Sequence, residues 1–244
     1  MLVTDALVLR RSDYRDYDRM VTLISPNYGR LEASARGVKK PKSPLINATE
    51  PFCAGEFGFA STKAGLTLAQ CEIIEGNYPI REDYDKLIHA SYYAQLLLAA
   101  SQPGEASPPL FQLGLKSLAH LSYSSVPPEL ITAMFEMHYM LILGESPRMD
   151  SCLNCGQQVD GDAVFDASAG GVFCPDCRGS GQPITRGARR ILMKAPRAAF
   201  ETVDLLKDRE EWPEAAAHIR RFVSNRIDQF PRQMPELYTG EYQL

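Results

Sequence analysis

The sequence lacks the short motifs that mark common enzyme sites. It contains no G-x-x-x-x-G-K-[ST], no G-x-G-x-x-G and no G-x-S-x-G pattern. It therefore has neither the phosphate-binding loops of ATPases and dinucleotide enzymes nor the nucleophile turn of the α/β hydrolases. None of its four histidines has a glutamate two positions later, which argues against a zinc-dependent nucleobase deaminase. These absences favour a protein that binds other molecules over an enzyme.

Long apolar runs and a strong net charge are also absent. No run approaches the roughly 20 residues that a membrane-spanning helix needs. No N-terminal stretch joins a basic start to an apolar run and a small-residue cleavage site, so we expect a cytoplasmic protein without membrane association. The net charge of −4 gives no overall attraction to nucleic acid, and any such binding must come from local basic surfaces. With 244 residues and 45% hydrophobic content, the chain can bury a substantial core.

Four of the six cysteines form two closely spaced pairs in the segment SCLNCGQQVDGDAVFDASAGGVFCPDCRG. Eighteen residues separate Cys155 from Cys174, and this spacing is typical of a four-thiolate zinc site. Disulfides are the rival interpretation, but nothing in the sequence directs the chain to an oxidising compartment. We therefore predict a zinc ribbon that binds one Zn²⁺ per chain through Cys152, Cys155, Cys174 and Cys177.

The predicted zinc is structural rather than catalytic. A catalytic zinc usually keeps one open position for water, whereas four thiolates complete the tetrahedron. Gly156 is expected to take the open backbone conformation of a metal-binding turn, and Gly170 and Gly171 mark a hairpin turn before the second pair. The remaining cysteines, Cys53 and Cys71, lie in apolar sequence and are predicted to be small core residues.

Basic residues gather in two stretches. Residues 28–48 contain a single acid, Glu32, and five basic residues: Arg30, Arg36, Lys39, Lys40 and Lys42. The second stretch follows the cysteines and has no acid before Glu201; its basic residues are Arg178, Arg186, Arg189, Arg190, Lys194 and Arg197. A charge run often only keeps a surface solvated, so charge alone does not establish a binding surface.

Residues 1–80 read as five short strands separated by Pro, Gly and Asn. The strands are expected in LVTDALVLR, MVTLIS, RLEASARGV, PFCAGEFGFA and LTLAQCEII. In the third, Leu31, Ala33 and Ala35 alternate with Arg30 and Arg36, which places the arginines on the solvent face. Five strands of this length predict an OB-fold β-barrel, a fold that commonly binds single strands.

From about Asp83 the pattern becomes helical. Asp83 or Asp85 could cap the first helix, and Thr185 could cap a later helix through ARRILMKA. The last helix carries an apolar stripe that ends at Ile227 and Phe230. We predict an α+β multidomain protein with an OB-fold domain at residues 1–80, a C-terminal α-helical domain at 81–150 and 182–244, and an interrupting four-cysteine zinc ribbon at 151–181.

The order of these parts resembles the RecO family of bacterial DNA repair and recombination mediators. The resemblance is carried by ALVLRRSDYRDYDRMVTLISPNYGR leading into ARGVKKPKSPL, then EPF, then LILGESPRMDSCLNCG and GGVFCPDC, and it covers essentially the whole chain. At Tyr14-Arg15-Asp16-Tyr17 the sequence departs from the Tyr-Gly-Glu that the family often has.

The resemblance implies a non-enzymatic, nucleoid-associated mediator with an N-terminal OB-fold, a helical domain and a zinc ribbon. Such proteins bind single- and double-stranded DNA and anneal complementary strands. With the partner RecR they load RecA recombinase onto DNA coated by single-strand binding protein. By position, the family's basic DNA surface corresponds to Arg30, Arg36, Lys39, Lys40 and Lys42, with Arg10 and Arg11 as further candidates.

The resemblance also implies recruitment by the acidic tail of single-strand binding protein, which ends in an apolar residue. We expect a basic and apolar notch to receive it near Arg189, Arg190, Lys194 and Arg197. Two alternatives remain open: a zinc-stabilised adaptor that binds only proteins, and an unrecognised zinc enzyme. Salt-dependent binding of bare oligonucleotides would separate the mediator from the adaptor.

Overall fold

The structure is a computed structural model that describes residues 1–177 and 179–227. Arg178 of the second basic stretch and the predicted helical residues beyond 227, including Phe230, lie outside the described residues. The described residues divide into two compact units, 1–123 and 124–227. Among the described residues, no helix combines the length and the apolar character needed to cross a membrane.

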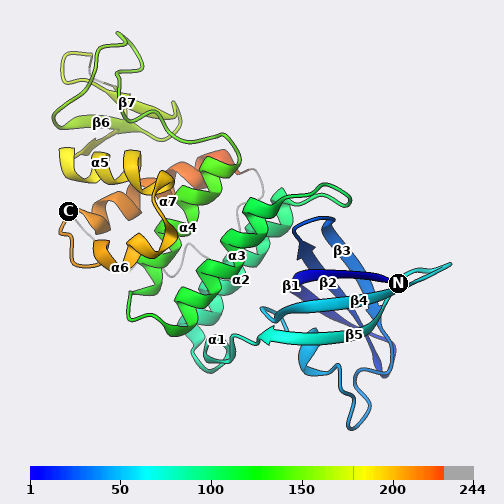
Figure 1. Ribbon diagram of the computed structural model, residues 1–244. Helices are drawn as coiled ribbons and strands as arrows, with labels where there is room; N and C mark the ends of the chain where they lie inside the picture. Colours follow the sequence, from blue (N-terminus) through cyan, green and yellow to red (C-terminus); the bar gives the residue numbers. More distant parts are fainter. Residues whose placement is uncertain (178, 228–244) are drawn as a thin grey trace. The chain divides into compact units, whose positions relative to one another are not determined.

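The first unit begins with a closed five-stranded barrel (Figure 1). Its strands are β1 (Leu2–Tyr14), β2 (Asp18–Ser25), β3 (Gly29–Ala35), β4 (Ala54–Thr62) and β5 (Gly65–Glu75). They follow the order β1-β2-β3-β5-β4, and β1 closes the barrel because its first half pairs with β4 and its second half with β2. The predicted five-stranded barrel is confirmed.

Alternation of side chains explains why these segments form strands. In β3, Leu31, Ala33 and Ala35 are buried, whereas Arg30 is half-buried and Glu32 is exposed. The inward residues of all five strands meet in one core, which includes Ala6, Val8, Val21, Leu23, Leu31, Ala33, Cys53, Phe57, Phe59 and Leu68. Cys53 is a core residue and Cys71 packs against this core, and burial raises the pKa of the two thiols to about 11 and about 12.

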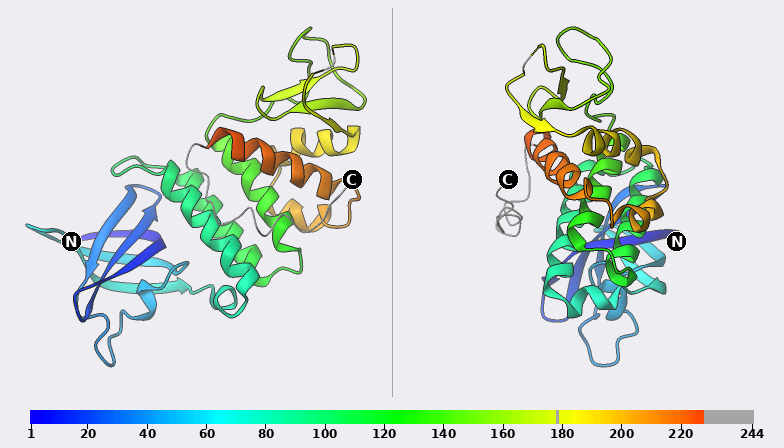
Figure 2. Two further views of the ribbon diagram at one scale, coloured as in Figure 1. Left: turned by 180° about the vertical axis from the view of Figure 1, so that it is seen from behind. Right: turned by 90° about the vertical axis from the view of Figure 1, so that its left-hand side faces the viewer.

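Three helices complete the first unit: α1 (Tyr78–Glu82), α2 (Tyr84–Ala100) and α3 (Pro108–Tyr123). The side chain of Asp83 accepts hydrogen bonds from the N–H groups of Asp85 and Lys86, so Asp83 rather than Asp85 caps α2. Helices α2 and α3 lie side by side (Figure 2), and both contact β1. The barrel and these helices therefore belong to one packed unit.

The second unit combines helices with a small sheet. Its helices are α4 (Pro128–Ile142), α5 (Arg186–Lys194), α6 (Val203–Leu206) and α7 (Trp212–Arg226). Thr185 caps α5 as predicted, because its hydroxyl accepts a hydrogen bond from the N–H of Ala188 at 3.2 Å. The sheet has the order β7-β6-β8 and comprises β6 (Ala163–Asp166), β7 (Gly171–Phe173) and β8 (Gln182–Ile184). Figure 1 shows α5 beside this sheet.

Candidate functional site

Two turns of the second unit bring the four paired cysteines together. Their sulfur atoms all lie within 4.8 Å of one another, and all four are free thiols. Gly156 has φ of 73° and donates its N–H to the carbonyl of Cys152 at 3.0 Å, which closes the first turn. The N–H of Cys177 donates to the carbonyl of Cys174 at 3.1 Å and closes the second. The predicted four-cysteine cluster is confirmed as an arrangement suited to a metal ion.

The charges of the sulfurs indicate what this cluster can hold. Backbone N–H groups of Cys155 and Cys174 lower the pKa of Cys152 to about 6. The Asn154 amide lowers the pKa of Cys177, but the neighbouring sulfurs of Cys174 and Cys155 outweigh it and raise that pKa to about 12. Four thiolates this close repel one another, so full ionisation needs a cation between them. The donor set therefore fits a soft or borderline metal ion with four sulfur ligands.

The first basic stretch forms a loop against the β1–β2 hairpin of the barrel. The N–H of Lys39 donates to the carbonyl of Tyr17 at 3.0 Å, and the N–H of Gly37 donates to the Asp18 carboxylate at 2.7 Å. These bonds fix residues 36–42, called the basic loop below, at the hairpin end of the barrel. Arg36, Lys40 and Lys42 are exposed there, and none of them makes an ion pair with a described residue.

Lys39 has a different environment from its neighbours. Its ammonium group lies 2.9 Å from the Asp13 carboxylate. The hydrogen bond from Lys39 is the main reason why the pKa of Asp13 is lowered. Asp13 also lies 3.6 Å from the guanidinium of Arg19, which in turn contacts Glu50 at 3.0 Å. The ammonium group of Lys39 is therefore already paired within the protein, in a network with Asp13, Arg19 and Glu50.

The remaining candidates lie on strands β1 and β3 of the barrel rather than in the basic loop. Arg30 is at the opposite end of β3, where it pairs with Ile24 and its backbone N–H donates to Gln102 at 3.1 Å. Arg11 forms an ion pair with Glu50 at 3.3 Å. Arg10 and Arg11 line a cavity of about 270 Å³ whose other walls include Phe52 and residues of α2. The structure therefore brings together the basic loop but not all seven predicted residues.

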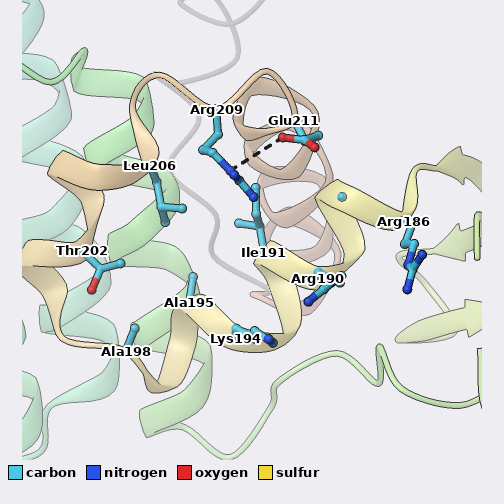
Figure 3. A pocket seen from close by; sticks show the side chains of 11 residues that line it. Arg186, Arg190, Ile191, Lys194, Ala195, Ala198, Thr202, Leu206, Arg209 and Glu211 are labelled. Atoms are coloured by element: carbon cyan, nitrogen blue, oxygen red, sulfur yellow. Dashed lines mark ion pairs between the residues drawn. The ribbon is translucent and has the colours of Figure 1, made fainter. Parts of the chain in front are cut away.

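The second basic stretch lines a groove in the second unit (Figure 3). Arg186, Arg190 and Lys194 follow one another at four-residue spacing along α5 and are exposed. The groove has a volume of about 440 Å³, and its apolar lining includes Ile191, Ala195, Ala198 and Leu206. Arg209 also lines it and forms an ion pair with Glu211 at 3.9 Å. The groove thus has an apolar floor and a mainly basic rim, in which Glu211 is the one acid among the described lining residues.

Two predicted residues of this stretch do not line the groove. Arg189 is only 3% exposed, and its guanidinium donates to the carbonyls of Met149 at 2.6 Å and Gly161 at 3.3 Å. Arg197 is exposed and donates to the carbonyl of Met193 at 3.3 Å. Sequence reasoning missed Arg186 and Arg209 as rim residues, although the four-residue spacing of Arg186, Arg190 and Lys194 could have identified Arg186.

Two protein-family models match this chain. Residues 1–77 match the family model for the recombination protein O N terminal, and residues 81–235 match the model for the recombination protein O C terminal. The chain belongs to the RecO family. It is a DNA repair and recombination protein, and the RecO family consists of non-enzymatic recombination mediators. The predictions of the family and of a non-enzymatic role are confirmed.

Individual members of the RecO family support this assignment over most of the chain. The chain is 30% identical over 235 residues to the DNA repair protein RecO of Bacillus pumilus. The aligned region covers 94% of this chain and 89% of that protein. The corresponding protein of Dehalococcoides mccartyi is 30% identical over 235 residues, or 95% and 92% of the two chains. That of Moorella thermoacetica is 32% identical over 180 residues, or 72% of this chain and 66% of that protein.

Proposed function

We propose that this protein binds single- and double-stranded DNA and anneals complementary strands. The observation that carries the proposal is the basic loop, whose Arg36, Lys40 and Lys42 are exposed, unpaired by described acids and held against the barrel by backbone hydrogen bonds. A fixed set of cations lowers the repulsion between two phosphate backbones and leaves the bases free to pair. This function requires no general acid, base or nucleophile.

An annealing assay with protein alone tests this function. Wild-type protein should accelerate the pairing of two complementary oligonucleotides without any nucleotide cofactor, and Lys40→Ala/Lys42→Ala should slow it. Lys63→Glu changes the net charge by the same amount and is the matched control. Lys63 lies in the β4–β5 turn, near the start of β1, where Leu2 pairs with Phe59 of β4. The basic loop instead adjoins the other end of β1, near Tyr14. Lys63 is therefore distant from the basic loop.

The outcome also separates the mediator from the protein-only adaptor. Equal annealing rates for wild type, the double variant and the control would show that the basic loop is a solvated surface. Wild-type protein without any effect on annealing would favour the adaptor.

The family context supports three protein partners. We propose that the chain acts with RecR to load RecA onto DNA coated by single-strand binding protein, and that the groove on α5 receives the acidic tail of that protein. The basic rim would contact the acidic residues, and the floor formed by Ile191, Ala195 and Leu206 would bury the terminal apolar residue.

Binding of a tail peptide tests the groove. Arg190→Ala/Lys194→Ala should weaken it about tenfold or more, because two rim charges are lost. Arg197→Glu changes the net charge by the same amount as the double substitution, but Arg197 does not line the groove. This variant should bind the peptide like wild type. Equal affinity for all three proteins would place the tail elsewhere.

We further propose that the four-cysteine centre holds one structural Zn²⁺. Four sulfur ligands that all lie within 4.8 Å of one another support this ion. Cys152, Cys155, Cys174 and Cys177 would be the ligands. The zinc would supply cross-linking of the two turns rather than chemistry.

A further inference from the structure

The β1–β2 hairpin presents two tyrosines whose rings remain open to solvent. Tyr14, the last residue of β1, is 45% exposed, and Tyr17, just before β2, is 53% exposed. Exposure alone does not distinguish these rings, since Tyr84 is 77% exposed. What sets them apart is the cations and the loop that lie beside them.

Each ring is paired with a cation. The guanidinium of Arg15 lies 5.1 Å from the centre of the Tyr14 ring, and the ammonium of Lys40 lies 5.9 Å from the centre of the Tyr17 ring. Both distances are within the range of cation–π attraction. Each cation thus brings positive charge beside its ring.

Arg15 occupies its position at a conformational cost. Its φ is 58°, in the left-handed region that favours glycine over residues with a side chain. Such strain often marks a functional position. At this position, the guanidinium reaches the Tyr14 ring, which a glycine cannot do.

The hairpin and the basic loop form one fixed surface. The Tyr17 carbonyl accepts the N–H of Lys39, and Asp18 accepts the N–H of Gly37. The ion pair between Lys39 and Asp13 adds a side-chain link. The rings are thereby held next to the exposed cations of the basic loop.

We propose that Tyr14 and Tyr17 are stacking positions for unpaired bases of a single-stranded nucleic acid. The inference rests on the proposed DNA binding and adds selectivity to it. An aromatic ring stacks on any base whose face is free, whereas bases inside a duplex are already stacked on their neighbours. The basic loop attracts both forms of DNA through phosphate, and the tyrosines favour the single-stranded form.

Substitution of both rings tests the selectivity. Tyr14→Leu/Tyr17→Leu should weaken binding to a single-stranded oligonucleotide about 25-fold or more, since each of the two stacked bases contributes about fivefold or more. Affinity for the matched duplex should change less than twofold. The slope of log affinity against log salt should stay the same, because no phosphate contact is removed.

Three further variants complete the design. Tyr14→Phe/Tyr17→Phe should bind like wild type, because stacking uses the ring and not the hydroxyl. Tyr84→Leu removes an exposed tyrosine of α2 and should also bind like wild type. Arg15→Gly should retain the hairpin, because glycine accepts its φ, yet bind single strands more weakly than wild type.

A base analogue provides an independent readout of stacking. An oligonucleotide containing 2-aminopurine should lose fluorescence on binding wild type and keep it on binding Tyr14→Leu/Tyr17→Leu. Unchanged single-strand affinity and quenching in that variant, with salt-dependent binding intact, would overturn this inference alone. Absence of salt-dependent DNA binding by wild type would overturn the proposed function as well.

Discussion

At the scale of the residue, the role of a charge depends on partners that are distant in the sequence. Lys39 and Lys40 are neighbours, but Lys39 pairs with Asp13, 26 positions away, while Lys40 is exposed. Arg189 and Arg190 differ in the same way, because Arg189 donates to a carbonyl 40 positions away. The local charge pattern is sufficient to find the two basic stretches. It cannot show which of their basic side chains, such as Lys39 and Arg189, are already bound to groups elsewhere in the protein.

Arg189 is predicted to be a stability residue. Arg189→Ala would remove the hydrogen-bond donor of the Met149 and Gly161 carbonyls. The substitution should lower the free energy of unfolding by about 2 to 3 kcal/mol. Urea unfolding measures this difference. Arg190→Ala is the matched control, because Arg190 is exposed, and its free energy should change by less than about 0.5 kcal/mol. Equal effects of the two variants would contradict the assigned role.

Asp13 is predicted to restrain DNA binding. Its carboxylate engages Lys39 and borders the basic loop, so Asp13→Asn should free one more cation. Single-strand affinity should rise several-fold, and the salt slope should steepen by about 0.7, the value for one additional phosphate contact. Fluorescence anisotropy across a salt series measures both. A weaker affinity in the variant would mean that Lys39 must be held by Asp13 to function.

The pH dependence of this restraint follows from the pKa of Asp13. Lys39 lowers that pKa from 3.8, so the carboxylate stays ionised as pH falls from about 8 to about 5. The ratio of affinities between Asp13→Asn and wild type should therefore be constant over that range. It should shrink only below about pH 4, where protonation removes the wild-type charge. A ratio that changes within the higher range would contradict the pairing.

At the scale of the element, strands and capped helices were predictable because their signals are local. Alternating burial in β3 and the cap residues Asp83 and Thr185 agree with the sequence pattern. Short elements such as α1 and β8 were missed, since five or three residues do not complete a recognisable period. The cysteine cluster was predictable because metal-ligand spacing is a local signal as well.

Metal removal is predicted to loosen the four-cysteine centre. Native protein purified without chelators should contain about one zinc per chain, and Cys174→Ser should lose the zinc and unfold at lower urea concentration. Cys53→Ala is the control, because Cys53 belongs to the barrel core, and it should retain the zinc. Metal analysis and urea unfolding measure the two effects. Native protein without zinc would contradict this prediction.

At the scale of the whole molecule, an acidic chain carries two separate basic surfaces. The net charge is −4, yet the first unit holds the basic loop and the second unit holds the groove on α5. We predict that the two surfaces act independently. Lys40→Ala/Lys42→Ala should leave tail-peptide affinity unchanged, and Arg190→Ala/Lys194→Ala should change single-strand affinity less than twofold. A shared loss in both assays would indicate one composite surface.

The salt dependence of single-strand binding tests the central claim most directly. Three to four loop cations that contact phosphates should give wild type a slope of log affinity against log salt between about −2 and −3. Lys40→Ala/Lys42→Ala should flatten it by about 1.4, the value for two lost phosphate contacts. Lys63→Glu, with the same net charge, should keep the wild-type slope. Equal slopes for all three proteins would contradict the claim that the basic loop is the DNA-binding surface.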